Sequence, residues 1–162
     1  MIRPAVYDDI EGVVEIYNQA IDAHFQTAFL ERLTVADREE WFREHLGTAF
    51  PLFVYELDGK VVGWFSISPY RAGRAALRHT VEISYFVHNA YFNKGIGSQL
   101  LEHGLSACRS LGYRTAIAII LERNIPSIQL MKKFDFDMWA FLPEVAEFDG
   151  VVCSHLYYGV KL

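Results

Sequence analysis

The sequence has few cysteines and no long apolar run, and both absences narrow the class of protein. Its 162 residues include two cysteines, Cys108 and Cys153, with no Cys-x-x-Cys pair and no histidine cluster beside them. We therefore expect no disulfide framework and no bound metal, and a reducing compartment is the default. No apolar run approaches the roughly 20 residues that span a bilayer, and the amino terminus lacks a signal-peptide pattern. A cytoplasmic protein with no membrane partner is expected.

A strongly basic face is also lacking. The formal net charge is -5, the isoelectric point is about 5.6, and acidic and basic residues are interspersed. Proteins that bind a nucleic acid duplex usually carry a basic patch, so nucleic acid is not an expected partner. The length and the ordinary balance of apolar and charged residues predict one compact domain over residues 1–162.

Hydrophobic periodicity predicts a mixed α/β domain built on a sheet. A short strand at residues 2–5 precedes a helix that starts at Asp8, where Glu11 completes a capping-box pattern. A second helix starts at Thr34. The turn signals Asp58-Gly59 and Asp149-Gly150 indicate two hairpins. The other expected elements are strands at residues 52–57, 61–68, 80–88, 115–121, 137–141 and 151–162, and helices starting at Gly95 and at Ser127.

The junction between the strand at residues 80–88 and the next helix has the chemistry of an anion cradle. Glycines at 95 and 97 let the backbone approach a ligand closely, and the first amides of a helix have no internal partner. Lys94 adds a flexible cation and Ser98 a hydroxyl donor. Alone, this pattern also fits a plain strand-to-helix turn. It is not a Walker loop, because no Gly-Lys-Ser/Thr triplet is present, and a dinucleotide fingerprint would need glycine at Leu100.

Taken together, several motifs make the chain resemble the GCN5-related N-acetyltransferase (GNAT) superfamily. The resemblance is closer to its phosphinothricin and methionine sulfoximine acetyltransferase branch. It extends over nearly the whole chain and is carried by residues 2–5, 16–18, 78–82, 95–97 and 124–127. It implies a single GNAT-like domain with a central, mostly antiparallel, twisted sheet flanked by helices.

The resemblance also implies that acetyl-CoA is the cosubstrate. The cradle would hold the CoA pyrophosphate, the strand before it would pair with the pantetheine arm, and Asn124 would contact the cofactor near its thiol. The residues implied in the cradle are Asn93, Lys94, Gly95, Ile96, Gly97 and Ser98, and those on the strand are Phe86, Val87 and His88.

Glu82 is the candidate general base. Attack on a thioester needs a neutral amine, and a positioned carboxylate can remove the proton of an alkylammonium group. A carboxylate inside a strand is costly to bury without a role or a partner. The other interpretation is a solvent-facing or ion-paired glutamate, and His79 and His88 are rival bases because histidine titrates near neutrality.

The acceptor pocket is expected from two segments. In the branch that the chain resembles, the loop before the strand at residues 80–88 helps to form this pocket, and an arginine fork suits a carboxylate. Arg74 or Arg78 is therefore expected to hold an amino-acid-like acceptor, although either could equally be a solvated loop residue. Tyr17 and Thr27 are expected on the opposite wall.

Three positions depart from the pattern of the family. Phe92 stands where the family usually has arginine or glutamine, which removes one donor to the phosphates. Met131 stands where the family has a tyrosine or a histidine that can protonate the leaving thiolate; Tyr157 or Tyr158 is a conceivable substitute. Asp135 replaces a glycine after the same helix, and aspartate tolerates the left-handed conformation that this position needs.

The sequence thus predicts an acetyl-CoA-dependent amine N-acetyltransferase that acts by direct attack. The acceptor is expected to be a small-molecule amine of the phosphinothricin or methionine sulfoximine type, and its identity stays open. A homodimer is possible, because members of this branch commonly form dimers. The alternatives are an acyl-CoA-binding sensor or regulatory module with weak catalysis, which Phe92 and Met131 favour, and a nucleotide-binding domain.

Overall fold

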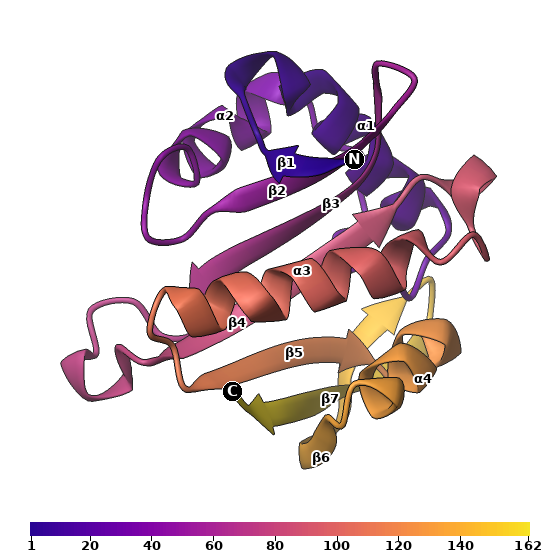
Figure 1. The fold of residues 1–162 in the computed structure, drawn as a ribbon. Coiled ribbons are helices and arrows are strands. Elements are labelled where there is room, and N and C mark those ends of the chain that lie inside the picture. Colours follow the sequence, from indigo (N-terminus) through magenta and orange to yellow (C-terminus); the bar gives the residue numbers. More distant parts are fainter.

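A computed structural model describes the whole chain, Met1–Leu162, as one seven-stranded sheet with helices on both faces (Figure 1). The strand order is β1-β2-β3-β4-β5-β7-β6, and only the β4–β5 pair is parallel. The expected mixed α/β fold with a mostly antiparallel sheet is confirmed. The elements are β1 (Ile2–Pro4), α1 (Ile10–Asp22), α2 (Val35–Glu44), β2 (Leu52–Leu57), β3 (Lys60–Pro69), β4 (Thr80–Val87), α3 (Ile96–Ser110), β5 (Thr115–Leu121), α4 (Ile125–Lys133), β6 (Asp137–Phe148) and β7 (Val151–Lys161).

Two hydrophobic clusters fix the layers on either side of the sheet. On one face, α1 and α2 pack on β2 and β3 through a cluster that includes Val13, Phe42 and Trp64. On the other face, a larger cluster joins α3 to β3, β4 and β5, and Leu100 and Phe65 are completely buried in it. None of the helices is both long and apolar enough to cross a membrane.

Gly104 sets how closely α3 approaches the sheet. A β-carbon at this position would lie 2.2 Å from the ring of Phe65 on β3, which is closer than real contacts allow. Because glycine has no side chain, α3 can lie directly against that ring. Figure 1 shows the helix crossing in front of β3 and β4, with its first turn near the carboxyl end of β4.

Both predicted hairpin turns are confirmed, and two element boundaries differ from the sequence prediction. Asp58 and Gly59 have positive φ angles of 50° and 75°, as a tight hairpin turn requires. Strand β6 runs to Phe148, well beyond the expected end at residue 141, because it pairs with β7 across two register shifts. Helix α4 begins at Ile125, since Asn124 caps it and Pro126 occupies its first turn.

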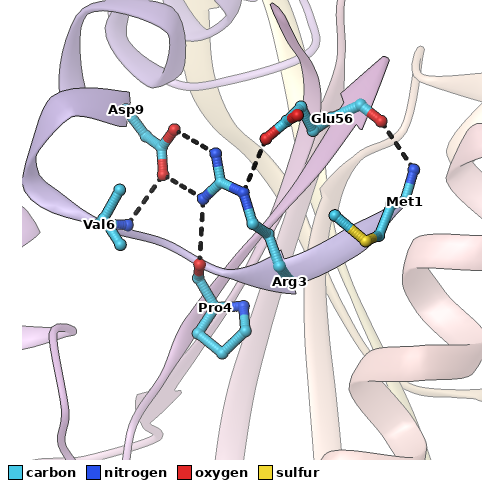
Figure 2. Close-up of polar contacts among 6 residues, drawn as sticks. All are labelled: Met1, Arg3, Pro4, Val6, Asp9 and Glu56. Atoms are coloured by element: carbon cyan, nitrogen blue, oxygen red, sulfur yellow. Dashed lines mark hydrogen bonds and ion pairs between the residues drawn. The ribbon is translucent and has the colours of Figure 1, made fainter. Parts of the chain in front are cut away.

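The start of the chain is held by an ion-pair network, shown in Figure 2. Arg3 on β1 donates two hydrogen bonds to the carboxylate of Asp9, at 2.7 and 2.8 Å, and a third to Glu56 on β2, at 2.8 Å. Asp9 also accepts from the N–H of Val6, at 2.8 Å. The predicted capping box of Asp8 with Glu11 is therefore wrong: a 3₁₀ turn over Tyr7–Asp9 precedes α1, and Asp9 satisfies the free backbone donor.

The network makes Asp9 a stabilising carboxylate. Burial alone would raise the pKa of Asp9, but the hydrogen bonds from Arg3 and from Val6 outweigh burial and lower it. A carboxyl group with a lowered pKa in the folded state stabilises the fold above its unfolded pKa, near 3.9. This contribution disappears as the pH falls through the lowered pKa of the folded state.

We expect the substitution Asp9→Asn to lower the free energy of unfolding by about 2 kcal/mol at neutral pH, because it removes the carboxylate that accepts two of the hydrogen bonds of Arg3 and leaves Glu56 as its only charged partner. Urea denaturation of both proteins measures the difference, with the exposed Glu11→Gln change on the same helix as the control. The difference should shrink as the pH is lowered below 4. A difference that stays constant down to pH 2, or an effect no larger than that of Glu11→Gln, would contradict this account.

Candidate active site

The site begins where β4 and β5 separate. The two parallel strands pair only from Thr80 to Glu82 on β4, which lie opposite Thr115 to Ile117 on β5. Beyond this point β4 continues to Val87 with β3 as its only partner, and β5 continues with β7. Figure 1 shows the two strands diverging toward the end at which α3 begins. One side of β4 beyond Glu82 is therefore an open strand edge.

A cavity of about 400 Å³ fills this opening. Its walls come from the open edge of β4, from the diverging end of β5, from the first turn of α3 and from the start of α4. Most of the residues predicted to bind the cofactor line it, namely Phe86, Val87, Asn93, Gly95, Ile96, Gly97, Ser98 and Asn124. His88 and Lys94 do not.

The first turn of α3 presents free amides to this cavity. Gly95 caps the helix with a left-handed φ of 77°, and Asn93 also has a positive φ, of 61°. The first hydrogen bond of the helix joins the N–H of Gln99 to the carbonyl of Gly95, so the earlier amides have no partner in the helix. No acidic side chain lies in this turn. Free amides and the positive end of the helix dipole favour an anionic group here.

Two lysines lie near this turn, and the sequence pointed to only one of them. The ammonium group of Lys94 lies 4.6 Å from the centre of the Tyr91 ring. Lys133, at the end of α4, donates a hydrogen bond of 3.2 Å to the hydroxyl of Ser98. Lys133 was missed because it is 35 positions from Ser98 in the sequence and belongs to no motif.

Asn124 has a structural role that the sequence prediction did not include. Its side-chain oxygen caps α4 by accepting from the N–H of Ser127, at 3.3 Å. The same side chain lines the cavity, so its amide group is held in a fixed orientation at the wall. Contact between Asn124 and a cofactor stays a prediction.

Glu82 lies at the fork between the strands. It is the last residue of β4 that pairs with β5, and on the other side it pairs with Ser68 of β3. Its side chain is half-buried. Burial raises the pKa of Glu82, and its carboxylate takes part in none of the ion pairs of the protein. The ion-paired interpretation of Glu82 is therefore wrong, and a carboxylate of raised basicity is left at the fork.

Tyr17 and Thr27 come together on the α1–α2 face of the sheet, where the alternation of β4 also directs Glu82 and Phe86. The hydroxyl groups of Tyr17 and Thr27 are hydrogen-bonded at 2.8 Å, and the ring of Tyr17 meets that of Phe86 edge-on at 4.9 Å. Burial raises the pKa of Tyr17, and the negative charge of Glu82 adds to this rise. Tyr17, Thr27 and Phe86 therefore lie together beside Glu82 on this face of the sheet.

The two arginines expected to bind the acceptor, Arg74 and Arg78, form hydrogen bonds within their own loop. Arg74 and Arg78 lie between β3 and β4, where each guanidinium donates to a backbone carbonyl of its own loop: Ala72 at 3.3 Å for Arg74 and Ala75 at 3.0 Å for Arg78. Neither residue lines the cavity. Their predicted contact with an acceptor carboxylate stays a prediction.

A further cation, Arg38, lies on the same face of the sheet as Glu82 and was not singled out from the sequence. Arg38 on α2 is half-buried, with its guanidinium 3.9 Å from the centre of the Trp41 ring and 5.1 Å from that of Tyr17. Nothing in the local sequence of α2 distinguishes Arg38 from the charged residues around it. Its position depends on the packing of α2 against α1.

One rival base, His88, and two departures from the family pattern, Met131 and Asp135, can also be placed. The side chain of His88 accepts from the N–H of Ala90, and the backbone N–H of His88 donates to the carbonyl of Val62 on β3. Met131, on α4, is completely buried in the core. Asp135 adopts the expected left-handed conformation, with φ of 60°, so the turn after α4 survives the loss of glycine.

Two other tyrosines can be compared with the missing donor at Met131. Tyr158 is buried in the core, and Tyr157 is a half-buried residue of β7 that pairs with Ile119 and Ala140. Tyr85 on β4 lines the cavity, and its hydroxyl is buried without a hydrogen-bond partner. Burial raises the pKa of Tyr85 to about 12, so its hydroxyl stays protonated at neutral pH.

Several known proteins are similar to this chain in sequence or in fold. The Bacillus subtilis (strain 168) protein YwnH is 39% identical over 150 residues, which cover 92% of this chain and 91% of the relative. The L-methionine sulfoximine/L-methionine sulfone acetyltransferase of Salmonella typhimurium is 32% identical over 145 residues, which cover 89% and 84%. The crystal structure of a Sinorhizobium meliloti phosphinothricin acetyltransferase in complex with acetyl-CoA has a TM-score of 0.94 at 26% identity, with 100% of this chain and 88% of that chain covered.

The family assignment rests on most of the chain. Residues 12–136 match the acetyltransferase (GNAT) family, and this range contains the fork at Glu82, the cavity and the first turn of α3. The chain therefore belongs to the GNAT acetyltransferase family, in the branch of the phosphinothricin and methionine sulfoximine acetyltransferases, as an acetyl-CoA-dependent N-acetyltransferase.

Proposed function

We propose that the protein transfers an acetyl group from acetyl-CoA to the amine of a small, amino-acid-like acceptor, with Glu82 as the general base. The observation that carries this proposal is the half-buried carboxylate of Glu82, without a protein partner, at the point where β4 and β5 separate. Relatives of known name act on compounds of this class, including L-methionine sulfoximine and phosphinothricin.

The cofactor side of the proposal uses the residues around the cavity. The free amides of Gly97 and its neighbours in the first turn of α3 suit a pyrophosphate, and Lys94 and Lys133 add positive charge nearby. The open edge of β4 at Phe86 and Val87 offers backbone groups to an extended chain such as the pantetheine arm. When bound, acetyl-CoA supplies the activated acyl group, and the protein positions this group and excludes water from it.

The catalytic side depends on the basicity of Glu82. An amine enters the site mostly as an ammonium group, since alkylammonium pKa values lie near 10.4. Glu82 takes up this proton directly or through a water molecule, and the nitrogen lone pair is then free to attack the thioester carbonyl. The carbon–sulfur bond breaks and CoA leaves as a thiolate, and the second proton that the nitrogen loses on forming the amide passes through water to the sulfur. Burial without a counter-ion raises the pKa of Glu82, which makes it a stronger base than an exposed glutamate.

We expect Glu82→Gln to lower kcat for amine acetylation by about 100-fold to 10,000-fold, because the amide cannot accept the proton. Steady-state release of CoA thiol measures the loss, and calorimetry with acetyl-CoA should show unchanged affinity for the cofactor. In the wild-type protein kcat/KM should rise with pH through the pKa of Glu82, which burial places above the ordinary glutamate value near 4.3. The variant should lack this limb.

The matched control is Glu102→Gln, an exposed glutamate on α3 that should leave the rate unchanged. A Glu82→Gln protein with activity within threefold of wild type would refute the role of Glu82 as base. Binding of acetyl-CoA without turnover of any amine by the wild-type protein would instead support an acyl-CoA sensor.

We also propose that the protein assembles as a homodimer through exposed apolar side chains of β6 and β7. Strand β6 is at the edge of the sheet, and such edges are commonly covered by a partner. A two-fold axis would place the same apolar patch of two copies face to face. The large apolar side chains exposed on these strands are Met138, Trp139, Phe141, Val145, Val151 and Val152.

Light scattering after size-exclusion chromatography tests the assembly. We expect the wild-type protein to have the mass of two 18.6 kDa chains, and Phe141→Glu to have the mass of one, because a carboxylate would be buried in the interface. Leu30→Glu, which changes an exposed apolar residue outside β6 and β7, serves as the control and should remain a dimer. A monomeric wild-type protein would contradict the proposal.

A further inference from the structure

Arg38 differs from the arginines of the protein that form ion pairs. Arg3, Arg32 and Arg43 each donate hydrogen bonds to a carboxylate of the protein, at distances from 2.5 to 3.1 Å for the ion pairs. Arg38 is half-buried and forms no hydrogen bond or ion pair of this kind. Burial lowers the pKa of its guanidinium, and only the phenol of Tyr17 opposes this decrease. Its guanidinium is held by two aromatic rings instead.

The aromatic contacts fix the group without using its hydrogen-bond donors. The guanidinium carbon lies 3.9 Å from the Trp41 ring centre and 5.1 Å from the Tyr17 ring centre. Contact with a ring face engages the flat side of a guanidinium, whereas its N–H donors lie at the edge. The rings are themselves held in place, since Trp41 packs on Trp64 and on His45. Arg38 thus offers a pre-oriented donor edge.

Arg38 and Glu82 share neighbours on this face of the sheet. Tyr17 touches Arg38 with its ring, packs on Phe86 of β4, and responds to the charges of both Arg38 and Glu82. His45, at the end of α2, contacts Ser68 at 3.2 Å, and Ser68 is the strand partner of Glu82. The unpaired cation and the unpaired carboxylate therefore lie on the same face of the sheet, and both are neighbours of Tyr17.

An α-amino acid has the complementary pair of charges. Its amine needs a base, and its carboxylate needs a donor fork such as a guanidinium. We propose that Arg38 binds the carboxylate of the acceptor while Glu82 receives the proton of its amine, so that Arg38 selects free amino acids over other amines. This inference rests on the proposed function and adds its specificity: a diamine would bring a second positive charge toward Arg38, and a peptide amino terminus has no carboxylate beside its amine.

The test compares L-methionine sulfone with its carboxamide, which has the same amine and no carboxylate, and with the diamine putrescine. We expect wild-type kcat/KM to be at least tenfold higher for the acid than for the carboxamide. Arg38→Met keeps an unbranched apolar side chain, shorter than that of arginine, and removes the charge and the hydrogen-bond donors. It should lower kcat/KM for the acid by tenfold to a hundredfold, mainly through KM, and leave the value for the carboxamide within threefold.

Arg74→Met and Arg78→Met are the matched controls, since both residues lie on the loop and were the carboxylate receptors expected from the sequence. They should keep the preference for the acid. The inference is overturned if Arg38→Met keeps that preference, or if either loop variant loses it. A general defect of folding would lower the rates for acid and carboxamide alike, so the ratio of the two separates specificity from damage.

A failure of the proposed function gives a different result. Suppose that Glu82→Gln remains active, so that the proposed role of Glu82 as base fails. Arg38 still recognises the carboxylate if calorimetry in the presence of CoA shows that the acid binds the wild-type protein and that Arg38→Met weakens this binding. If Glu82→Gln is inactive and Arg38→Met binds and acetylates the acid as the wild type does, Glu82 keeps its role and the inference about Arg38 fails.

Discussion

The separation of β4 from β5 beyond Glu82 is the constraint on which the rest of the site depends. Parallel pairing between neighbouring strands would normally continue, and here it ends after three residues on each strand. The opening leaves room for a cavity between the strands and exposes one edge of β4. It also leaves a carboxylate at the point of separation, where a fully paired sheet would have to bury it between helices.

The opening divides the chemistry between two sets of groups. On the side of α3 and α4, much of the binding potential comes from backbone: free amides at the first turn of α3 and the open edge of β4. On the side of α1 and α2, side chains dominate, with Tyr17, Arg38 and Glu82 around one region. Backbone groups change little when the sequence changes. This division suits an enzyme family that keeps one cofactor and varies its acceptor.

Features that depend on local sequence could be predicted, and those that depend on packing could not. The strand, the glycines and the helix from residue 80 to residue 110 follow from alternation, turn chemistry and helical periodicity within one segment. Glu82 could be singled out because a carboxylate in an apolar strand is unusual. Arg38 could not, since a charged residue on a helix is ordinary until the rings of Tyr17 and Trp41 enclose it. Asp9 was missed for a similar reason, because its partner Arg3 is on a different element.

The open edge of β4 has a consequence for the lifetime of the protein as well as for its chemistry. A sheet that lacks a stretch of pairing is incomplete, and a molecule that lies along this edge completes it. Binding to the folded state alone adds stability in proportion to the logarithm of ligand concentration, about 2.7 kcal/mol at a hundredfold excess over the dissociation constant. If the acyl donor lies along this edge, as proposed, its supply sets part of the stability of the enzyme, and a shortage of the donor would leave a larger fraction of the chain open to proteolysis.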